Sequence, residues 1–162
     1  MIPRAAAVPR DALLHRYVEQ AGCYTDCFEV MHPMEADLPA FIEAFYTTWL
    51  FRLERLVLGV GLRRAIPDRE VSALAQGAEG FAAWRVEDRS ERQILLCDLS
   101  GRTRSWLAVA PKDGGTTRLL FGSAVVGDEQ QGLSRVMRGL LPLHRLYSRA
   151  LLRLAEWRLR KT

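Results

Sequence analysis

The chain has 162 residues, 49% hydrophobic and 26% charged, which is the balance of a folded globular protein and excludes a disordered one. Its formal net charge of +4 is mildly basic. Because arginines on helix surfaces commonly serve solubility, we expect no nucleic-acid partner. The most hydrophobic window, residues 41–62, carries four charged side chains, so we expect no membrane-spanning helix and no membrane partner.

The cysteines indicate a reducing compartment. Cys23, Cys27 and Cys97 are odd in number and form no dense framework of disulfides. The spacing of Cys23, Cys27 and His32 fits no standard zinc pattern, so we expect no metal, and no motif implies a cofactor. No apolar stretch of signal-peptide length follows Met1, and a cytoplasmic location is the expectation.

Helical and strand patterns alternate before Gly80. Residues 11–20 predict a short leading helix, and residues 24–32, rich in aromatic and branched side chains, predict a strand. A longer helix is predicted from Asp37, and a shorter one spans residues 68–76. The apolar face predicted for the longer helix comprises Phe41, Phe45, Trp49, Leu53, Leu56 and Val60.

The hydrophobic period changes to two after Gly80. Four strands are predicted, separated by breaks of hairpin length: 81–88, 92–99, 102–110 and 116–126. A long helix follows over residues 133–160, and Pro142 should bend or break it after Gly139. Its apolar stripe contains Leu133, Val136, Met137, Leu140, Leu141, His144, Tyr147, Leu151 and Leu154.

These elements predict one α+β domain over residues 1–162, in which residues 1–22 form an N-terminal helical extension. The turns also predict the strand register. A two-residue turn at Ser100-Gly101 pairs Leu96 with Ser105, and cross-strand partners share a face. Extending this register through the other turns gives an inward, mostly apolar face with four polar members: Asp98, Thr103, Ser105 and Ser123. The opposite face collects Gln93, Arg102, Arg104 and Trp106.

A family resemblance agrees with this layout. Leu141-Pro142-Leu143-His144-Arg145-Leu146 resembles the segment that closes the DUF2867 family of uncharacterised proteins, and residues 24–28 also resemble that family. The resemblance implies a START-like, helix-grip (SRPBCC) fold, with a curved antiparallel sheet packed on a long C-terminal helix and a cavity between them. The chain departs from the family in the second hairpin, where Thr103 and Ser105 stand in place of a histidine and an aspartate.

The leading hypothesis is therefore a domain that binds an apolar or aromatic small molecule in that cavity. The residues expected to line it are Trp84, Leu96, Asp98, Thr103, Ser105, Leu107, Phe121, Ser123, His144 and Tyr147. A second hypothesis is a cavity enzyme of cyclase, isomerase or hydrolase type, with His144 as general base supported by Asp98. The alternatives are that Asp98 is a solvated acid at the rim, next to a turn, and that His144 is a neutral histidine that ties the helix to the sheet. A third hypothesis is an interaction module that forms a homodimer or docks on a partner through Arg104 and Trp106, although this face could equally lie under the N-terminal segment.

Overall fold

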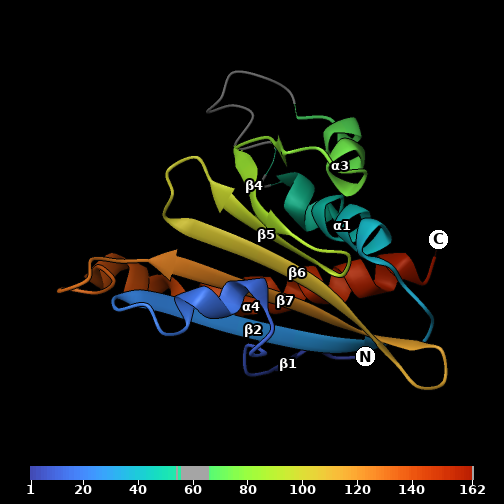
Figure 1. Cartoon of the computed structure of the whole chain (residues 1–162), viewed down its shortest axis with the longest axis horizontal. Coiled ribbons are helices and arrows are strands. Elements are labelled where there is room, and N and C mark those ends of the chain that lie inside the picture. Colours follow the sequence, from blue (N-terminus) through green and yellow to red (C-terminus); the bar gives the residue numbers. More distant parts are fainter. Residues whose placement is uncertain (54, 56–65, 162) are drawn as a thin grey trace.

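The computed structural model describes residues 1–53, 55 and 66–161. Within them the chain forms an antiparallel sheet accompanied by helices (Figure 1). The elements in chain order are β1 (Arg4–Ala5), the 3-10 helix η1 (Leu13–Tyr17), β2 (Cys23–His32), α1 (Leu38–Tyr46), α3 (Asp68–Ala75), β3 (Gly80–Phe81), β4 (Trp84–Arg89), β5 (Gln93–Asp98), β6 (Thr103–Lys112), β7 (Thr116–Val126) and α4 (Arg135–Leu159).

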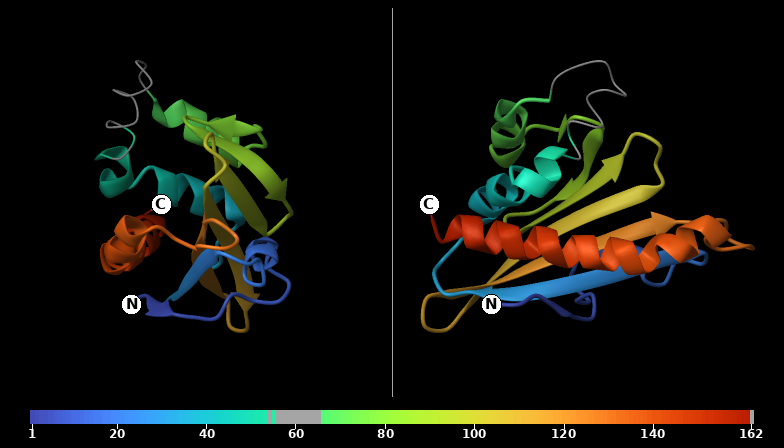
Figure 2. Two further views of the ribbon diagram at one scale, coloured as in Figure 1. Left: turned by 90° about the vertical axis from the view of Figure 1, so that its left-hand side faces the viewer. Right: turned by 180° about the vertical axis from the view of Figure 1, so that it is seen from behind.

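The described strands form one seven-stranded sheet in the order β1-β2-β7-β6-β5-β4-β3, and every neighbouring pair is antiparallel. The predicted register of β5, β6 and β7 is confirmed: Leu96 lies opposite Ser105, and Leu107 lies opposite Phe121. The register of β4 differs from the one that a loop at residues 89–91 predicts: the pairing shifts between Val86 and Asp88, and Val86 lies opposite Leu96. The fold class is therefore α+β, with a long C-terminal helix against the sheet, as predicted (Figure 2).

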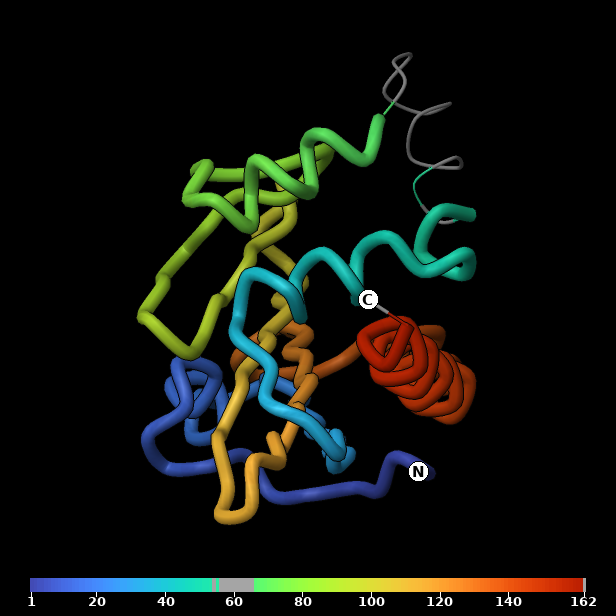
Figure 3. The backbone as a smooth tube through the Cα atoms, turned by 90° about the vertical axis from the view of Figure 1, so that its right-hand side faces the viewer, coloured from blue at the N-terminus to red at the C-terminus, as the bar shows by residue number. Residues whose placement is uncertain are grey.

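The inner face of the sheet carries the main apolar core. Side chains from β2, β5, β6 and β7 pack there against α1 and the second half of α4. Phe45 of α1 packs against Phe121 of β7, with ring centroids 4.7 Å apart and ring planes tilted by 44°. Seen end-on, α4 lies beside the sheet on the same side as α1 (Figure 3).

The outer face is covered by the N-terminal segment, which corrects the interaction hypothesis. Trp106 is only 1% exposed and packs in a second apolar cluster with Leu14 of η1. Gln93 fixes η1 in place, since its Oε1 accepts the Trp106 indole N–H at 2.9 Å and the Leu13 backbone N–H at 2.9 Å. Arg104 donates to Tyr17 and Glu87. A docking surface built on an exposed Trp106 is therefore wrong.

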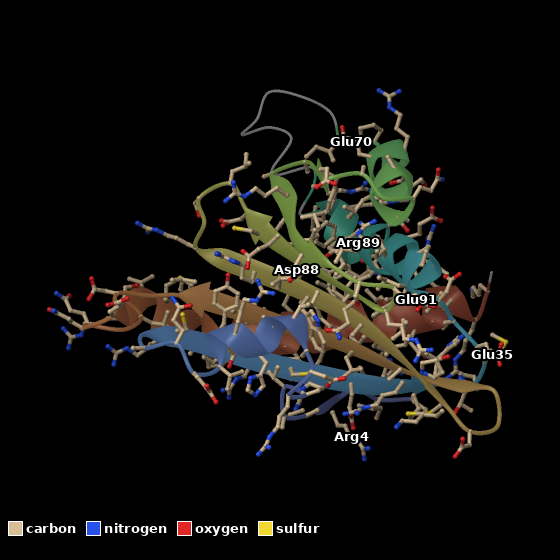
Figure 4. All side chains as sticks on the ribbon, in the orientation of Figure 1. Arg4, Glu35, Glu70, Asp88, Arg89 and Glu91 are labelled. Carbon is tan, nitrogen blue, oxygen red and sulfur yellow. The ribbon has the colours of Figure 1, made fainter. Side chains whose placement is uncertain are left out.

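Two adjacent residues at the end of β4, Asp88 and Arg89, connect the sheet to helices on its opposite faces. Asp88 forms an ion pair with Arg16 near η1, whereas Arg89 donates from Nη2 to the Leu74 carbonyl of α3 at 2.6 Å. Figure 4 labels both side chains. The sheet is thus held between η1 and α3 at this edge.

Helix α4 begins at an N-cap, Ser134, whose hydroxyl accepts the Met137 N–H at 3.2 Å. It runs unbroken through Pro142, so the expected break after Gly139 does not occur. Its C-terminal half is buried and is joined to β2 by His32 and Glu156, whose Nδ1 and Oε1 atoms lie 3.3 Å apart. Its N-terminal half, by contrast, leaves several large apolar side chains exposed: Val136, Met137, Leu140, Leu143 and Leu146.

Several predicted boundaries are wrong. The long helix from Asp37 ends at Tyr46, and a separate helical segment covers residues 49–53. Because of this break Trp49 is 64% and Leu53 is 55% exposed, while Leu56 and Val60 lie outside the described residues.

The N-terminal half contains further differences. The leading helix is a 3-10 helix of five residues, and strand β1 was not predicted. The strand predicted over residues 81–88 is divided into β3 and β4 by a turn in which Ala82 has φ 52°. Among the helices of the described part of the chain, α4 is the longest, and none combines the length and apolar character of a membrane span.

Candidate functional site

His144 lies on α4 above a pair of polar residues of the inner face. Asp26 of β2 and Ser123 of β7 are direct cross-strand partners, so their side chains project from the same face of the sheet. The Nε2 atom of His144 lies 2.8 Å from Ser123 Oγ and 3.4 Å from Asp26 Oδ2. The sheet and the helix thus bring an imidazole, a hydroxyl and a carboxylate together.

The direction of each hydrogen bond follows from the carboxylate. Ser123 Oγ lies 2.6 Å from Asp26 Oδ1, and a carboxylate can only accept, so the hydroxyl proton of Ser123 is donated to Asp26. The serine oxygen then accepts from Nε2, which assigns the ring proton to that nitrogen in neutral His144. Within the described residues, Nδ1 of His144 has no hydrogen-bond partner.

Asp26 is held as a carboxylate. It also accepts the Ser123 backbone N–H at 3.2 Å and the Tyr24 hydroxyl at 3.0 Å, and Tyr24 in turn accepts from Arg145. Burial of Asp26 acts to raise its pKa, but the hydrogen bonds from His144 and Ser123 outweigh burial and the pKa is lowered. The group is therefore ionised at neutral pH.

This arrangement differs from a serine hydrolase triad. In a triad the base accepts the serine proton and the acid holds its other ring nitrogen. Here Ser123 and Asp26 both approach Nε2 of His144, and the serine proton points to the carboxylate. Ser123 is thus not activated as a nucleophile, and the atom of His144 left to meet a ligand is Nδ1.

The expected pairing of His144 with Asp98 is wrong. The Asp98 carboxylate caps the β5–β6 hairpin, where it accepts the Ser100 hydroxyl at 2.6 Å and the backbone N–H groups of Arg102 and Thr103. Burial acts to raise the pKa of Asp98, but these bonds, with Ser100 first, lower it. Asp98 therefore stabilises the β5–β6 turn, and the carboxylate beside the His144 imidazole is that of Asp26.

An open cavity of ≈ 410 Å³ adjoins His144 along the first half of α4, which supplies all of its lining residues except Val125. The size is within the range of small-molecule pockets, and its walls are apolar apart from the His144 imidazole and the Tyr147 hydroxyl. The residues that line it are Val125, Met137, Leu140, Leu141, Leu143, His144 and Tyr147.

The other predicted lining residues lie elsewhere. Leu96, Leu107 and Phe121 are buried in the main core and do not line this cavity, and Trp84 packs against that core from β4. Ser105 is buried, with its Oγ 2.8 Å from the Tyr46 hydroxyl. Thr103 lines a larger, open cavity of ≈ 870 Å³ at the end of the sheet. The structure therefore brings together Ser123, His144 and Tyr147, but at the rim of the core and not inside it.

Asp26 was missed by the sequence reasoning, although a signal for it was present. In the strand over residues 24–32, Asp26 alternates with Phe28 and Val30, so the period of two places it on the inner face. An acid on an apolar strand face needs a partner, and His144 is that partner. Among the described residues, no group of three or more His, Cys, Asp or Glu side chains could hold a metal ion.

Comparison with known proteins adds little. The sequence matches no family model and no curated protein. The crystal structure of CalU16 from Micromonospora echinospora aligns with 99% of this chain and 96% of its own, at 14% identity and a TM-score of 0.39. A TM-score this low does not establish a shared fold.

Proposed function

We propose that this chain is a helix-grip domain of the START-like (SRPBCC) kind, similar to the DUF2867 family, that binds an apolar small molecule. The cavity along the first half of α4 receives the apolar body of the ligand. Nδ1 of His144 accepts a hydrogen bond from a ligand O–H or N–H, because Ser123 and Asp26 fix Nε2 as the donor. The observation that carries the proposal is this cavity of ≈ 410 Å³ with a single oriented imidazole in its wall.

The exposure of α4 supports the same function. Leu140 is 48% and Leu143 is 64% exposed, yet both belong to the apolar lining. Exposed apolar side chains grouped around a concavity are typical of binding sites, since burying them on a ligand is favourable. The helix is held by its C-terminal half, so these leucines are not needed for the core.

Titration with the uncharged fluorophore N-phenyl-1-naphthylamine tests the proposal. We expect saturable binding, weakened about tenfold by Leu140→Gln, because a polar group then replaces apolar wall. Val136→Gln is the matched control: Val136 is 72% exposed on the same helix and lines neither cavity, so this variant should bind as the wild type does. Absence of binding to the wild type, or equal loss in both variants, contradicts the proposal.

A cavity enzyme is the second candidate, and the observation that favours it is the same open Nδ1 atom. A histidine that lines a cavity, carries its proton on Nε2 and has no hydrogen-bond partner at Nδ1 can abstract a proton from a bound substrate. Asp26 would then stabilise the imidazolium from 3.4 Å. For any substrate found to turn over, His144→Gln should reduce kcat by about 100-fold or more while leaving binding of the fluorophore intact. Unchanged kcat removes this candidate.

A further inference from the structure

The cavity beside His144 adjoins the larger cavity at the end of the sheet. Val125 of β7 and Met137 of α4 line both. One molecule can therefore occupy the apolar cavity and extend past Val125 into the larger one. The larger cavity is bounded by the β5–β6 hairpin, by residues 126–134 and by the first turns of α4.

The lining of the larger cavity is basic. Arg102 comes from the β5–β6 hairpin, and Arg135 and Arg138 come from α4. The side chains of Arg102 and Arg135 form no hydrogen bond or ion pair with any described residue, whereas Arg138 donates from Nε to the Leu133 carbonyl at 3.1 Å. Three guanidinium groups from two separate elements thus face one space.

No carboxylate among the described residues forms an ion pair with these arginines. Among the described lining residues, Asp128 is the only acidic one, and its Oδ1 accepts the backbone N–H groups of Gln130 and Gln131 at 2.9 Å each. The first turn of α4 contains no acidic residue. The arginines therefore exceed the acid in this cavity by two charges, three minus one.

Resting on the function proposed above, we infer that the ligand is an amphipathic carboxylate. Its apolar body lies beside His144, and its carboxylate lies between Arg102 and the arginines of α4. Guanidinium groups bind carboxylates through paired N–H donors. A carboxylate head group would therefore give Arg102 and Arg135, which have no partner among the described residues, a hydrogen-bond acceptor. An uncharged ligand of the same length would leave both charges in water and gain nothing from them.

A matched pair of probes tests the inference. Decanoate and 1-decanol share an apolar chain and differ in charge. In competition with N-phenyl-1-naphthylamine, decanoate should bind the wild type about fivefold more tightly than 1-decanol, since exposed ion pairs contribute modestly. The double variant Arg102→Gln/Arg135→Gln should bind both equally. The control Arg92→Gln/Arg153→Gln removes the same charge from exposed positions outside the cavities and should keep the preference.

The outcomes separate the two proposals. Equal binding of decanoate and 1-decanol to the wild type overturns the carboxylate inference and leaves the cavity function standing. Failure of both probes and of the fluorophore overturns the cavity function itself. Binding of the protein to phosphatidylglycerol vesicles at protein concentrations where decanoate does not bind also overturns the inference. The arginines would then bind an anionic lipid surface and not a single carboxylate. Raising the salt concentration should weaken only the decanoate preference.

Discussion

At Asp26, three side chains from β2, β7 and α4 depend on one carboxylate. It accepts hydrogen bonds from Tyr24 and from both the backbone and the hydroxyl of Ser123, and it lies 3.4 Å from the His144 ring. Because its side chain is 7% exposed, little water is present to replace a lost contact. The residue should therefore contribute to stability as well as orient the imidazole.

Asp26→Asn should lower the free energy of unfolding by about 1.5–3 kcal/mol at neutral pH, the usual contribution of hydrogen bonds to a charged group. The folded-state pKa of Asp26 lies below its ordinary value of 3.8, so the carboxylate stabilises the fold above pH 3.8 and loses this effect as pH falls through the folded pKa. The difference between wild type and variant should shrink on acidification below 3.8. Urea unfolding at a series of pH values measures it.

The control for this series is Asp113→Asn, at the exposed tip of the β6–β7 hairpin. Its unfolding free energy should follow the wild type at each pH. A wild-type–Asp26→Asn difference that stays constant from neutral pH to about pH 2 would show that ionisation of Asp26 contributes nothing to stability.

The single residues were the hardest part to predict. The apolar stripe of the last helix correctly placed His144 toward the sheet, because a period of 3.6 fixes which side chains share a face. Asp98 could be predicted either as the acidic partner of His144, because it also faces inward, or as an acid at the rim beside its turn. A residue beside a turn can bond its own hairpin instead, and the backbone N–H groups of Arg102 and Thr103 compete successfully for Asp98.

At the level of elements, two glycines should respond oppositely to the same substitution. Gly122 of β7 faces η1, and a Cβ there would meet Leu14 Cδ2 at 2.6 Å and the Asp26 carbonyl oxygen at 2.8 Å. Gly122→Ala should therefore lower the free energy of unfolding by about 1–3 kcal/mol through overpacking.

Gly139, inside α4, is the matched site. A Cβ there has no neighbour within 4 Å, and alanine is the better helix former. Gly139→Ala should raise the free energy of unfolding by about 0.5–1 kcal/mol. Thermal or urea unfolding of both variants checks the pair, and a stabilised Gly122→Ala would mean that η1 does not pack on β7 as described.

The register of β5, β6 and β7 was predictable for a local reason. Tight turns at Ser100-Gly101 and at residues 113–115 determine which residues oppose each other, and a slip by one would invert every apolar side chain. The end of α1 was not predictable in the same way. The apolar period continues past Tyr46, but the Thr47 and Thr48 hydroxyls donate to the Glu43 and Phe45 carbonyls where the helix stops.

For the whole molecule, the N-terminal segment closes the second apolar layer. Leu14 and Tyr17 cover Trp106, Leu95 and Leu120 on the outer face. Periodicity alone could not predict which segment covers the outer face. A period of two shows which side chains share a face of the sheet, and it is the same whichever segment packs on that face.

Removal of residues 1–18 should expose that layer and cause self-association, since contiguous apolar surface of this kind is favourable to bury. Sedimentation velocity should show oligomers of the shortened chain, while circular dichroism reports that the sheet remains. Deletion of residues 1–2, both exposed, is the control and should change neither measurement. A shortened chain that sediments as the full chain does would contradict the covering role of η1.

The two halves of helix α4 have different roles: the C-terminal half packs in the core, and the first half lines the cavity. Residues near its C-terminal end, such as Leu152 and Ala155, are constrained by the interior, whereas Met137, Leu140 and Leu143, in the stretch before His144, line the adjoining cavity and take no part in the core. Substitutions in the latter stretch can alter which molecule is preferred without loss of folding. Related chains should therefore diverge fastest in the first three turns of this helix, and a library restricted to those turns is the economical route to new specificities.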